Sequence, residues 1–417
     1  MIEQVIDQVL RDDHLMRDFA ALCDTGGRFA GSDSEQAAQD YLSDRLAEIT
    51  GAKPYHHKVE YLGWSRGNSS LERLDSIGGL LPCVSLVRSP ATAADGLVAE
   101  LIDLGRGTEQ DFDARAAQIK GRIVLVRHEY MFATDTIHRR RKYQWALDAG
   151  AVGFLIACHL PGQGPVTGSS GATPERGIPA AGISAETAAT LISGGGAKIR
   201  FKVAAEQTPR STANLILDLP GITDEWVVLS AHIDGHHLAE SAMDNATGLA
   251  AVLAIARAMA PIVGQLKRGL RIALFTVEEW ALAGSKEYVD NMSDVDRGAI
   301  KLNLNLDSIA GSPNLTALTS EFAKLEDWLL EQSQAQSRTL GVHRPLMANS
   351  DHYNFARHGI PAVRLVAGFN EHESAIKYLL TSGDTRDKID PQDLRSASGF
   401  VAALAVKACQ ADELNLI

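Results

Sequence analysis

A chain of 417 residues is too long for one simple compact core, so two folded units are expected. Hydrophobic residues make up 45% and charged residues 22% of the chain, which excludes disorder as the default. The formal net charge of -12 repels phosphate backbones, so nucleic acid is excluded as an expected partner. The basic run over residues 138–142 is the local exception, and it predicts a solvated helix face.

The lack of a recognisable targeting signal and the pattern of cysteines favour the cytoplasm. Residues 1–20 are amphipathic and acidic, with no apolar signal core, and no run of about 18 apolar residues occurs that would predict a membrane span. The cysteines form no Cys-x-x-Cys pair, which favours buried free thiols over disulfides. We therefore expect a cytoplasmic protein without a membrane partner. A homo-oligomer is compatible with the sequence, which leaves the assembly state open.

The N-terminal half divides into two segments with different sequence patterns. Residues 1–50 predict helices, because apolar positions recur at helical spacing from Ile2 to Leu10 and from Ala37 to Leu46, and a strand follows at 58–62. From residue 64 to residue 208 glycine and proline are frequent and the apolar runs shorten to strand length, which predicts a separate, mainly β insert. This insert has one expected helix, 135–148, and expected strands at 98–104, 122–126, 153–157 and 198–203.

The C-terminal half alternates strands and helices, which predicts a parallel sheet. The expected strands are 226–231, 271–277, 302–306 and 361–366, and the expected helices are 245–260, 281–291, 322–336 and 391–409. The predicted fold class is therefore α/β, with a mostly parallel central sheet flanked by helices. Residues 1–63 and 209–417 are expected to form this domain around the insert 64–208.

Polar residues follow three consecutive predicted strands of this sheet. His232 comes directly after the first, Glu278 after the second and Asp307 after the third, while Asp244 opens the next helix. Ligands of open α/β sheets bind at the carboxyl ends of strands, so we expect these side chains at one rim. The acids that would meet there are Asp234, Asp244, Glu278, Glu279 and Asp307.

Carboxylates this close oppose each other's ionisation, and no lysine or arginine lies within these motifs to compensate them. One or two divalent cations would, and imidazole with carboxylates suits zinc first, with manganese or cobalt also compatible. Asp244 alone would suit a helix N-cap, and Glu278 alone the solvated first turn of a helix. His232 alone would suit a core histidine, and Asp307 alone a turn. Their joint placement at successive strand ends favours a metal site.

At these residues the sequence resembles the zinc-dependent exopeptidase family that includes bacterial aminopeptidases, glutamate carboxypeptidase and glutaminyl cyclase. The resemblance covers residues 210–395 in order and spacing, and residues 31–32 with the following helix resemble the family's N-terminal segment. The fold it implies is the zinc exopeptidase, phosphorylase/hydrolase-like α/β fold. The matching segments are 231–234, 243–248, 275–279, 283–285, 306–307, 350–352 and 359–362.

The insert has a resemblance of its own, to the protease-associated domain that many members of this family carry. Such domains shape or cover a substrate cleft and do no chemistry themselves. The matching segments are 121–127, 149–153, 178–184 and the return segment 212–216.

The resemblance implies a metal ligand set, carried over position by position. His232 and Asp307 would bind the first metal, Asp244 would bridge two metals, and Glu279 would bind the second.

It also implies two catalytic roles. Glu278 would be the general base that takes a proton from the attacking water, and Asp234 would orient His232 from behind.

The sequence departs from the family at the second metal. The family takes a histidine from a His-Thr-x-x-Asp-Thr stretch, and here Leu380 stands in that place, with no atom that can coordinate. His372, eight residues upstream, is the first candidate to replace it, if its loop folds back. His236, His237 and His352 are weaker candidates.

We therefore predict a metal-dependent hydrolase that cleaves an amide or peptide C–N bond, most simply an aminopeptidase-type exopeptidase with a peptide substrate. The missing ligand leaves open a one-metal hydrolase of a small non-peptide C–N bond, such as an acylated amino acid, an amino-aromatic compound or a secondary metabolite. A non-catalytic binding protein on the same fold, as in the transferrin receptor ectodomain, is the remaining alternative, although the acids and His232 are all present.

Overall fold

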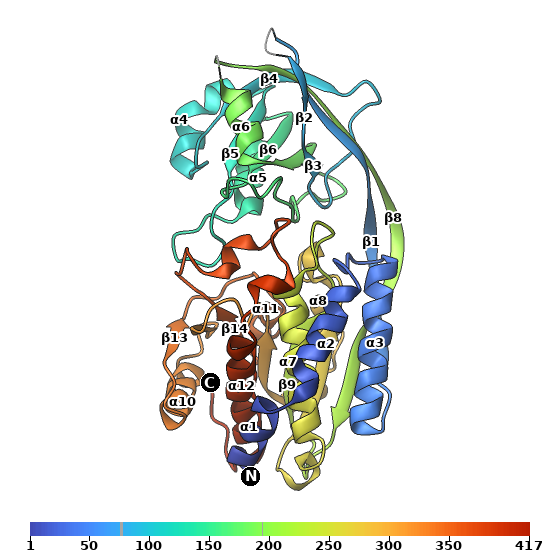
Figure 1. Ribbon diagram of the computed structural model, residues 1–417, viewed down its shortest axis with the longest axis vertical. Coiled ribbons are helices and arrows are strands. Elements are labelled where there is room, and N and C mark those ends of the chain that lie inside the picture. The colour runs from blue at the N-terminus through green and yellow to red at the C-terminus, as the bar shows by residue number, and fades with distance from the viewer. Residues whose placement is uncertain (76–77, 194) are drawn as a thin grey trace. The chain divides into compact units, whose positions relative to one another are not determined.

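The computed structural model describes residues 1–75, 78–193 and 195–417, which form two compact units. Unit 1 comprises Met1–Tyr61, Ser211–Leu379 and Asp384–Ile417, and unit 2 comprises Leu62–Arg210 and Leu380–Gly383. Two long paired strands, β1 (Tyr55–Arg73) and β8 (Lys198–Leu219), each contribute residues to both units (Figure 1). The inclusion of Leu380–Gly383 in unit 2 is not visible in the sequence pattern.

The sheet of unit 1 has the strand order β13-β12-β14-β11-β9-β10-β8. Its centre is parallel, as predicted, and consists of β9 (Trp226–His232), β10 (Gly269–Phe275), β11 (Ile300–Leu306) and β14 (Ala362–Ala367). The edges are partly antiparallel: β8 runs against β10, and β12 (Leu315–Leu318) runs against β14 and parallel to β13 (Leu340–His343). The predicted α/β class is confirmed.

Every residue of β9 from Val227 to His232 is buried, because helices cover both faces of this sheet. The long helices α7 (Thr247–Met259) and α12 (Pro391–Gln410) pack against β9, β10 and β11. Residues of α8 (Ala283–Asp290) and α11 (His352–Ala356) form a hydrophobic cluster with Val228, Ala273 and Phe275. The remaining helices are α1 (Ile2–Leu10), α2 (Asp13–Asp24), α3 (Asp33–Thr50), α9 (Asp294–Ala299) and α10 (Ala323–Ala335).

Helix α7 is the central helix of unit 1, and its sequence explains this position. Twelve of its thirteen residues are buried, and most are alanine or other small or aliphatic residues that allow close packing on α2, α12 and the sheet. The exception, Arg257, reaches outward to the carboxylates of Asp12 and Asp18. This burial fixes the start of α7, where Asp244 lies, against the ends of the strands.

In unit 2 the strand order continues from β8 as β4-β5-β6-β7-β3, and β1 pairs with β8 and with β2 (Gly79–Leu81). Strands β4 (Leu97–Asp103), β5 (Ile123–Arg127), β6 (Gly153–Ala157) and β7 (Ala180–Ile183) are mutually parallel, and β3 (Val84–Ser85) pairs antiparallel with β7. The predicted helix is α5 (Arg139–Asp148), and α4 (Glu109–Ile119) and α6 (Ala185–Ile192) were not predicted.

The prediction of a solvated face for the basic run is wrong for two of its residues. Arg139 is 5% and Lys142 1% exposed. The Lys142 ammonium donates to the main-chain oxygens of Arg106, at 2.7 Å, and Arg127, at 2.9 Å, and it contacts the Glu129 carboxylate. Acceptors from remote segments thus satisfy a buried cation, which a local charge pattern cannot reveal.

Among the described residues no helix is both long and apolar enough to cross a bilayer.

Candidate metal centre

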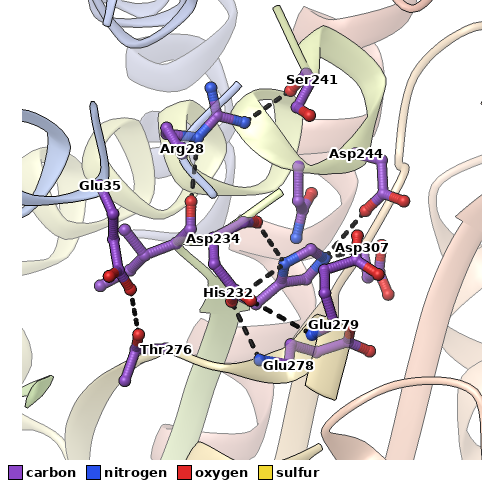
Figure 2. A network of polar contacts seen from close by, with 12 residues as sticks. Arg28, Glu35, His232, Asp234, Ser241, Asp244, Thr276, Glu278, Glu279 and Asp307 are labelled. Atoms are coloured by element: carbon purple, nitrogen blue, oxygen red, sulfur yellow. Dashed lines mark hydrogen bonds and ion pairs between the residues drawn. The ribbon is translucent and has the colours of Figure 1, made fainter. Parts of the chain in front are cut away.

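The carboxyl ends of β9, β10 and β11 meet at one edge of the sheet of unit 1. The parallel register places Phe275, the last residue of β10, beside His232, the last residue of β9. Asp307 directly follows β11, which pairs with β9 on the other side. His232 Nε2 lies 3.0 Å from Asp244 Oδ1 and 3.5 Å from Asp307 Oδ1. Figure 2 shows these three side chains together. The predicted convergence of these side chains is therefore present.

The side chains at this edge form two groups of possible ligands that share one carboxylate. The first donor group is His232, Asp244 and Asp307, and the second donor group is His236, Asp244 and Glu279. Within each group the ligand atoms lie within 4.8 Å of one another. In the second group, His236 Nε2 lies 2.6 Å from Glu279 Oε1. All four predicted metal ligands thus come together, and the structure adds His236.

Asp244 is held by the turn that precedes α7. It lies in the short segment Ala242–Ala246, where the backbone angles of Asp244 and Asn245 are not helical, and the Asp244–Asn245 peptide bond is cis. The Asn245 side chain donates to the carbonyl of Leu306 at 2.8 Å and accepts from the N–H of Gly248 at 3.0 Å. Asn245 therefore fastens the turn to the end of β11 and caps α7, while Asp244 remains directed at the histidines.

Glu278 and Glu279 lie in a short 3₁₀ turn, Glu278–Trp280, between β10 and α8. The Asp234 carboxylate accepts from the N–H of Glu278 at 3.0 Å and from the N–H of Glu279 at 3.2 Å. The carboxylate of Asp234 was expected to orient His232, but its main-chain oxygen makes the closer contact. His232 Nδ1 lies 2.9 Å from the main-chain oxygen of Asp234 and 3.9 Å from its carboxylate. The side chain of Asp234 thus positions the glutamate turn, and its backbone orients His232.

An arginine that the motifs do not contain compensates one of the carboxylates. Arg364, in the middle of β14, is 2% exposed, and its Nη2 lies 3.1 Å from Asp307 Oδ2. Burial alone would raise the pKa of Asp307, but the Arg364 guanidinium and the His232 imidazole hold that pKa below its usual range. A single arginine inside the apolar strand Ala362–Ala367 is the signal in the sequence that could have identified this residue.

Burial and neighbouring carboxylates oppose the ionisation of two other acids, Glu278 and Asp234. Burial raises the pKa of Glu278 well above its usual range, opposed by His232 and reinforced by Glu279. Burial likewise raises the pKa of Asp234 to about 7. For His232, burial would lower the pKa, but the Glu278 and Asp307 carboxylates raise it well above its usual range. Buried carboxylates with two imidazoles fit a zinc-type ion, which would supply the missing positive charge.

The first candidate for the missing ligand does not join the site. His372 is exposed and belongs to neither donor group. The structure therefore does not support the prediction that its loop folds back to the site. His237 is exposed, with its ring 5.5 Å from that of Phe29. His352 is buried at the start of α11, and burial lowers its pKa to about 3, but it lies in neither group.

Two family models match parts of this chain. Residues 214–405 match the model of peptidase family M28, and residues 85–191 match that of the PA domain. Aminopeptidase YwaD of Bacillus subtilis (strain 168) is 25% identical over 330 residues, 78% of this chain and 70% of that protein. Leucine aminopeptidase 2 of Trichophyton equinum is 29% identical over 291 residues, 69% of this chain, and the chain spans only 55% of its length.

Solved structures share the fold. A peptidase M28 precursor from Shewanella amazonensis superimposes with a TM-score of 0.82 at 22% identity, covering 99% of this chain and 96% of that one. The zinc aminopeptidase BSAP from Bacillus subtilis gives a TM-score of 0.75 at 23% identity, covering 96% and 95%. The fold and the edge-of-sheet site define a metallopeptidase-type α/β domain. More particularly, the segment that carries the site matches peptidase family M28, and a segment of unit 2 matches the PA domain.

Proposed function

We propose that the chain is a zinc-dependent exopeptidase of the aminopeptidase type, which hydrolyses the peptide bond after an N-terminal residue. The observation that carries the proposal is the pair of donor groups that share Asp244, buried except for the half-buried Glu279, with the buried Glu278 carboxylate beside them. The peptidase family match and the aminopeptidases among the relatives support the same reaction.

We assign the ion-binding roles from the contacts. His232 and Asp307 would hold one ion, Glu279 another, and Asp244 both, since it belongs to both donor groups. Bound zinc supplies Lewis acidity, which lowers the pKa of water from about 15.7 toward about 7 and stabilises negative charge on a carbonyl oxygen. The donor set suits this ion, because imidazole nitrogen and carboxylate oxygen are common zinc ligands.

Glu278 would act as the general base and acid. Its carboxylate takes a proton from the attacking water and returns it to the leaving amine, so that the peptide C–N bond breaks and a free amine leaves. Burial and the acidic neighbours raise its pKa, which makes it a stronger base than an exposed glutamate. The hydrogen bonds from the N–H groups of Glu278 and Glu279 to Asp234 keep the turn in place during the transfer.

The test uses aminoacyl-arylamides and dipeptides with free and acetylated N-termini. We expect hydrolysis of the free forms and a loss of about 10²- to 10⁴-fold in kcat for Glu278→Gln, with metal content and Tm unchanged. Glu287→Gln, on the exposed side of α8, is the matched control and should keep full activity. Near-normal turnover by Glu278→Gln would sink the assignment of the base.

One observation favours a second candidate, a one-metal hydrolase of a small non-peptide C–N bond. Leu380 occupies the position at which the family resemblance expects a histidine ligand. The same substrate panel, extended by acylated amino acids and amino-aromatic amides, separates the two candidates. Inactivity toward every peptide and arylamide in the metal-loaded protein, with hydrolysis of an acylated amino acid or an amino-aromatic amide, would favour the second.

We further propose a cytoplasmic location. All four cysteines lie within the described ranges and are free, with Cys23, Cys158 and Cys409 buried. Free thiols suit a reducing compartment. Cell fractionation that recovers the protein from a secreted or periplasmic fraction would contradict this location.

A further inference from the structure

The second donor group has an imidazole that the family pattern does not provide. We infer that His236 is the histidine ligand of the second metal ion, in the role that Leu380 cannot fill. This inference rests on the proposed metal-dependent function and concerns only which residue completes its second ion site.

The two donor groups have the same composition. Each combines one imidazole and one carboxylate of its own with the shared carboxylate of Asp244. His236 is 4% exposed, and its Nε2 lies 2.6 Å from Glu279 Oε1, so the imidazole points at the acid that the resemblance assigns to the second ion. One imidazole nitrogen and two carboxylate oxygens within 4.8 Å of one another suit a transition-metal ion.

The loop that carries His236 is rigidly held from the N-terminal segment. The guanidinium of Arg28 is fully buried and donates to the main-chain oxygens of Ile233 at 2.9 Å, Glu240 at 2.9 Å and Ser241 at 2.6 Å. Figure 2 shows the hydrogen bond to Ser241. The N–H of Gly235 donates in return to the carbonyl of Arg28 at 3.0 Å. The loop between β9 and the Asp244 turn therefore has its two ends tied to one side chain.

The backbone of His236 itself is fixed on both sides. Its N–H donates to Ser241 Oγ at 2.8 Å, and the Ser241 hydroxyl donates to its carbonyl at 3.1 Å. A Cβ at position 27 would lie 2.0 Å from the His236 oxygen, so only Gly27 allows the segment to approach so closely. Fixed backbone and burial leave the imidazole little freedom, which is what a metal ligand needs.

The other candidates lack one or more of these properties. His237, the next residue along the chain, is exposed and contacts the ring of Phe29. His372 is exposed, and His352 is buried outside both donor groups. Both ion positions would then take their imidazole from one short stretch, His232 and His236, rather than from two distant parts of the chain.

Metal content and affinity test the inference directly. Wild type, His236→Ala and His236→Gln are purified without chelator, analysed for metal per chain and titrated with cobalt, whose visible absorption reports the coordination of each ion. We expect two ions in wild type and one in both variants, with second-site affinity at least about 100-fold lower. His237→Ala is the matched control and should bind two ions. His236→Gln keeps a polar side chain of similar reach, so it reports ligation if the alanine variant misfolds, as judged by Tm.

Three results would overturn the inference. Retention of two ions at unchanged affinity by both His236 variants is the first, and loss of the second ion in His372→Ala is the second. The third is a wild type that binds a single ion. If that one-ion protein still hydrolyses aminoacyl substrates, the proposed function stands and only the role of His236 falls. If wild type binds no ion even after loading, both fall.

Discussion

Replacement of Arg28 by methionine would test how firmly the N-terminal segment holds the metal-site loop. Methionine fills a similar length without a charge or a donor, so packing is largely kept and the hydrogen bonds are lost. The guanidinium donates to five main-chain oxygens, those of Leu22, Gly26, Ile233, Glu240 and Ser241.

The structure sets the size of the expected effect. The carbonyls of Leu22 and Ser241 also accept backbone N–H groups, so they keep a partner in the variant. Of the other three, the buried carbonyl of Ile233 is left without this donor at a cost of about 1–3 kcal/mol, and the half-buried carbonyls of Gly26 and Glu240 cost less because water reaches them. The variant also no longer has to bury a cation, and the desolvation cost that this avoids offsets part of the loss. We expect Arg28→Met to lower the free energy of unfolding by about 1–3 kcal/mol.

The change in metal affinity is a second measurement, and its direction distinguishes loss of charge from displacement of the loop. The positive charge of Arg28 lies near the acids of the site, among them Asp244 and Asp234. By charge alone, its removal would strengthen cation binding. A weaker second-site affinity in Arg28→Met would therefore report displacement of the loop that carries His236, not a change in the electrostatic field.

Urea unfolding of the metal-free protein and cobalt titration of the folded protein measure the two effects. Arg357→Met, at an exposed arginine, is the control and should change stability by less than about 1 kcal/mol. An Arg28→Met protein as stable as this control, with unchanged second-site affinity, would refute the role given to Arg28.

Two further predictions concern the support of the glutamate turn. Burial, reinforced by Asp234 and opposed by a hydrogen bond from Thr276, raises the pKa of Glu35 from 4.5 to about 7. Because the folded state binds this proton more tightly, stability should fall by about 3 kcal/mol as pH rises between those values. Metal-free Glu35→Gln should lose that part of the slope in urea unfolding, and an unchanged slope would contradict it. At Gly284 a Cβ would lie 2.0 Å from the oxygen of Thr276, so Gly284→Ala should lower Tm, by about 1–3 kcal/mol of stability, whereas Gly298→Ala, with open space around it, should not.

Much of the site follows from local sequence alone. Strands buried on both faces appear as apolar runs, and the polar residue that ends such a run marks its carboxyl end. His232, Glu278 and Asp307 were identified in this way, because a parallel sheet must bring those ends to one edge. Asp244 follows from the helix start that comes next. The α/β class depends on the same alternation of strands and helices, which requires no knowledge of distant contacts.

The residues that complete and support the site were decided by tertiary structure. Arg364 lies on a strand whose order in the sheet, beside β11, is not readable from its position in the chain. His236 and His237 are adjacent and identical in chemistry, and only the loop held by Arg28 makes one buried and the other exposed. His372 was the better guess by sequence position and lies in neither donor group. A side chain's surroundings depend on segments hundreds of residues away, whereas periodicity reports only on its neighbours along the chain.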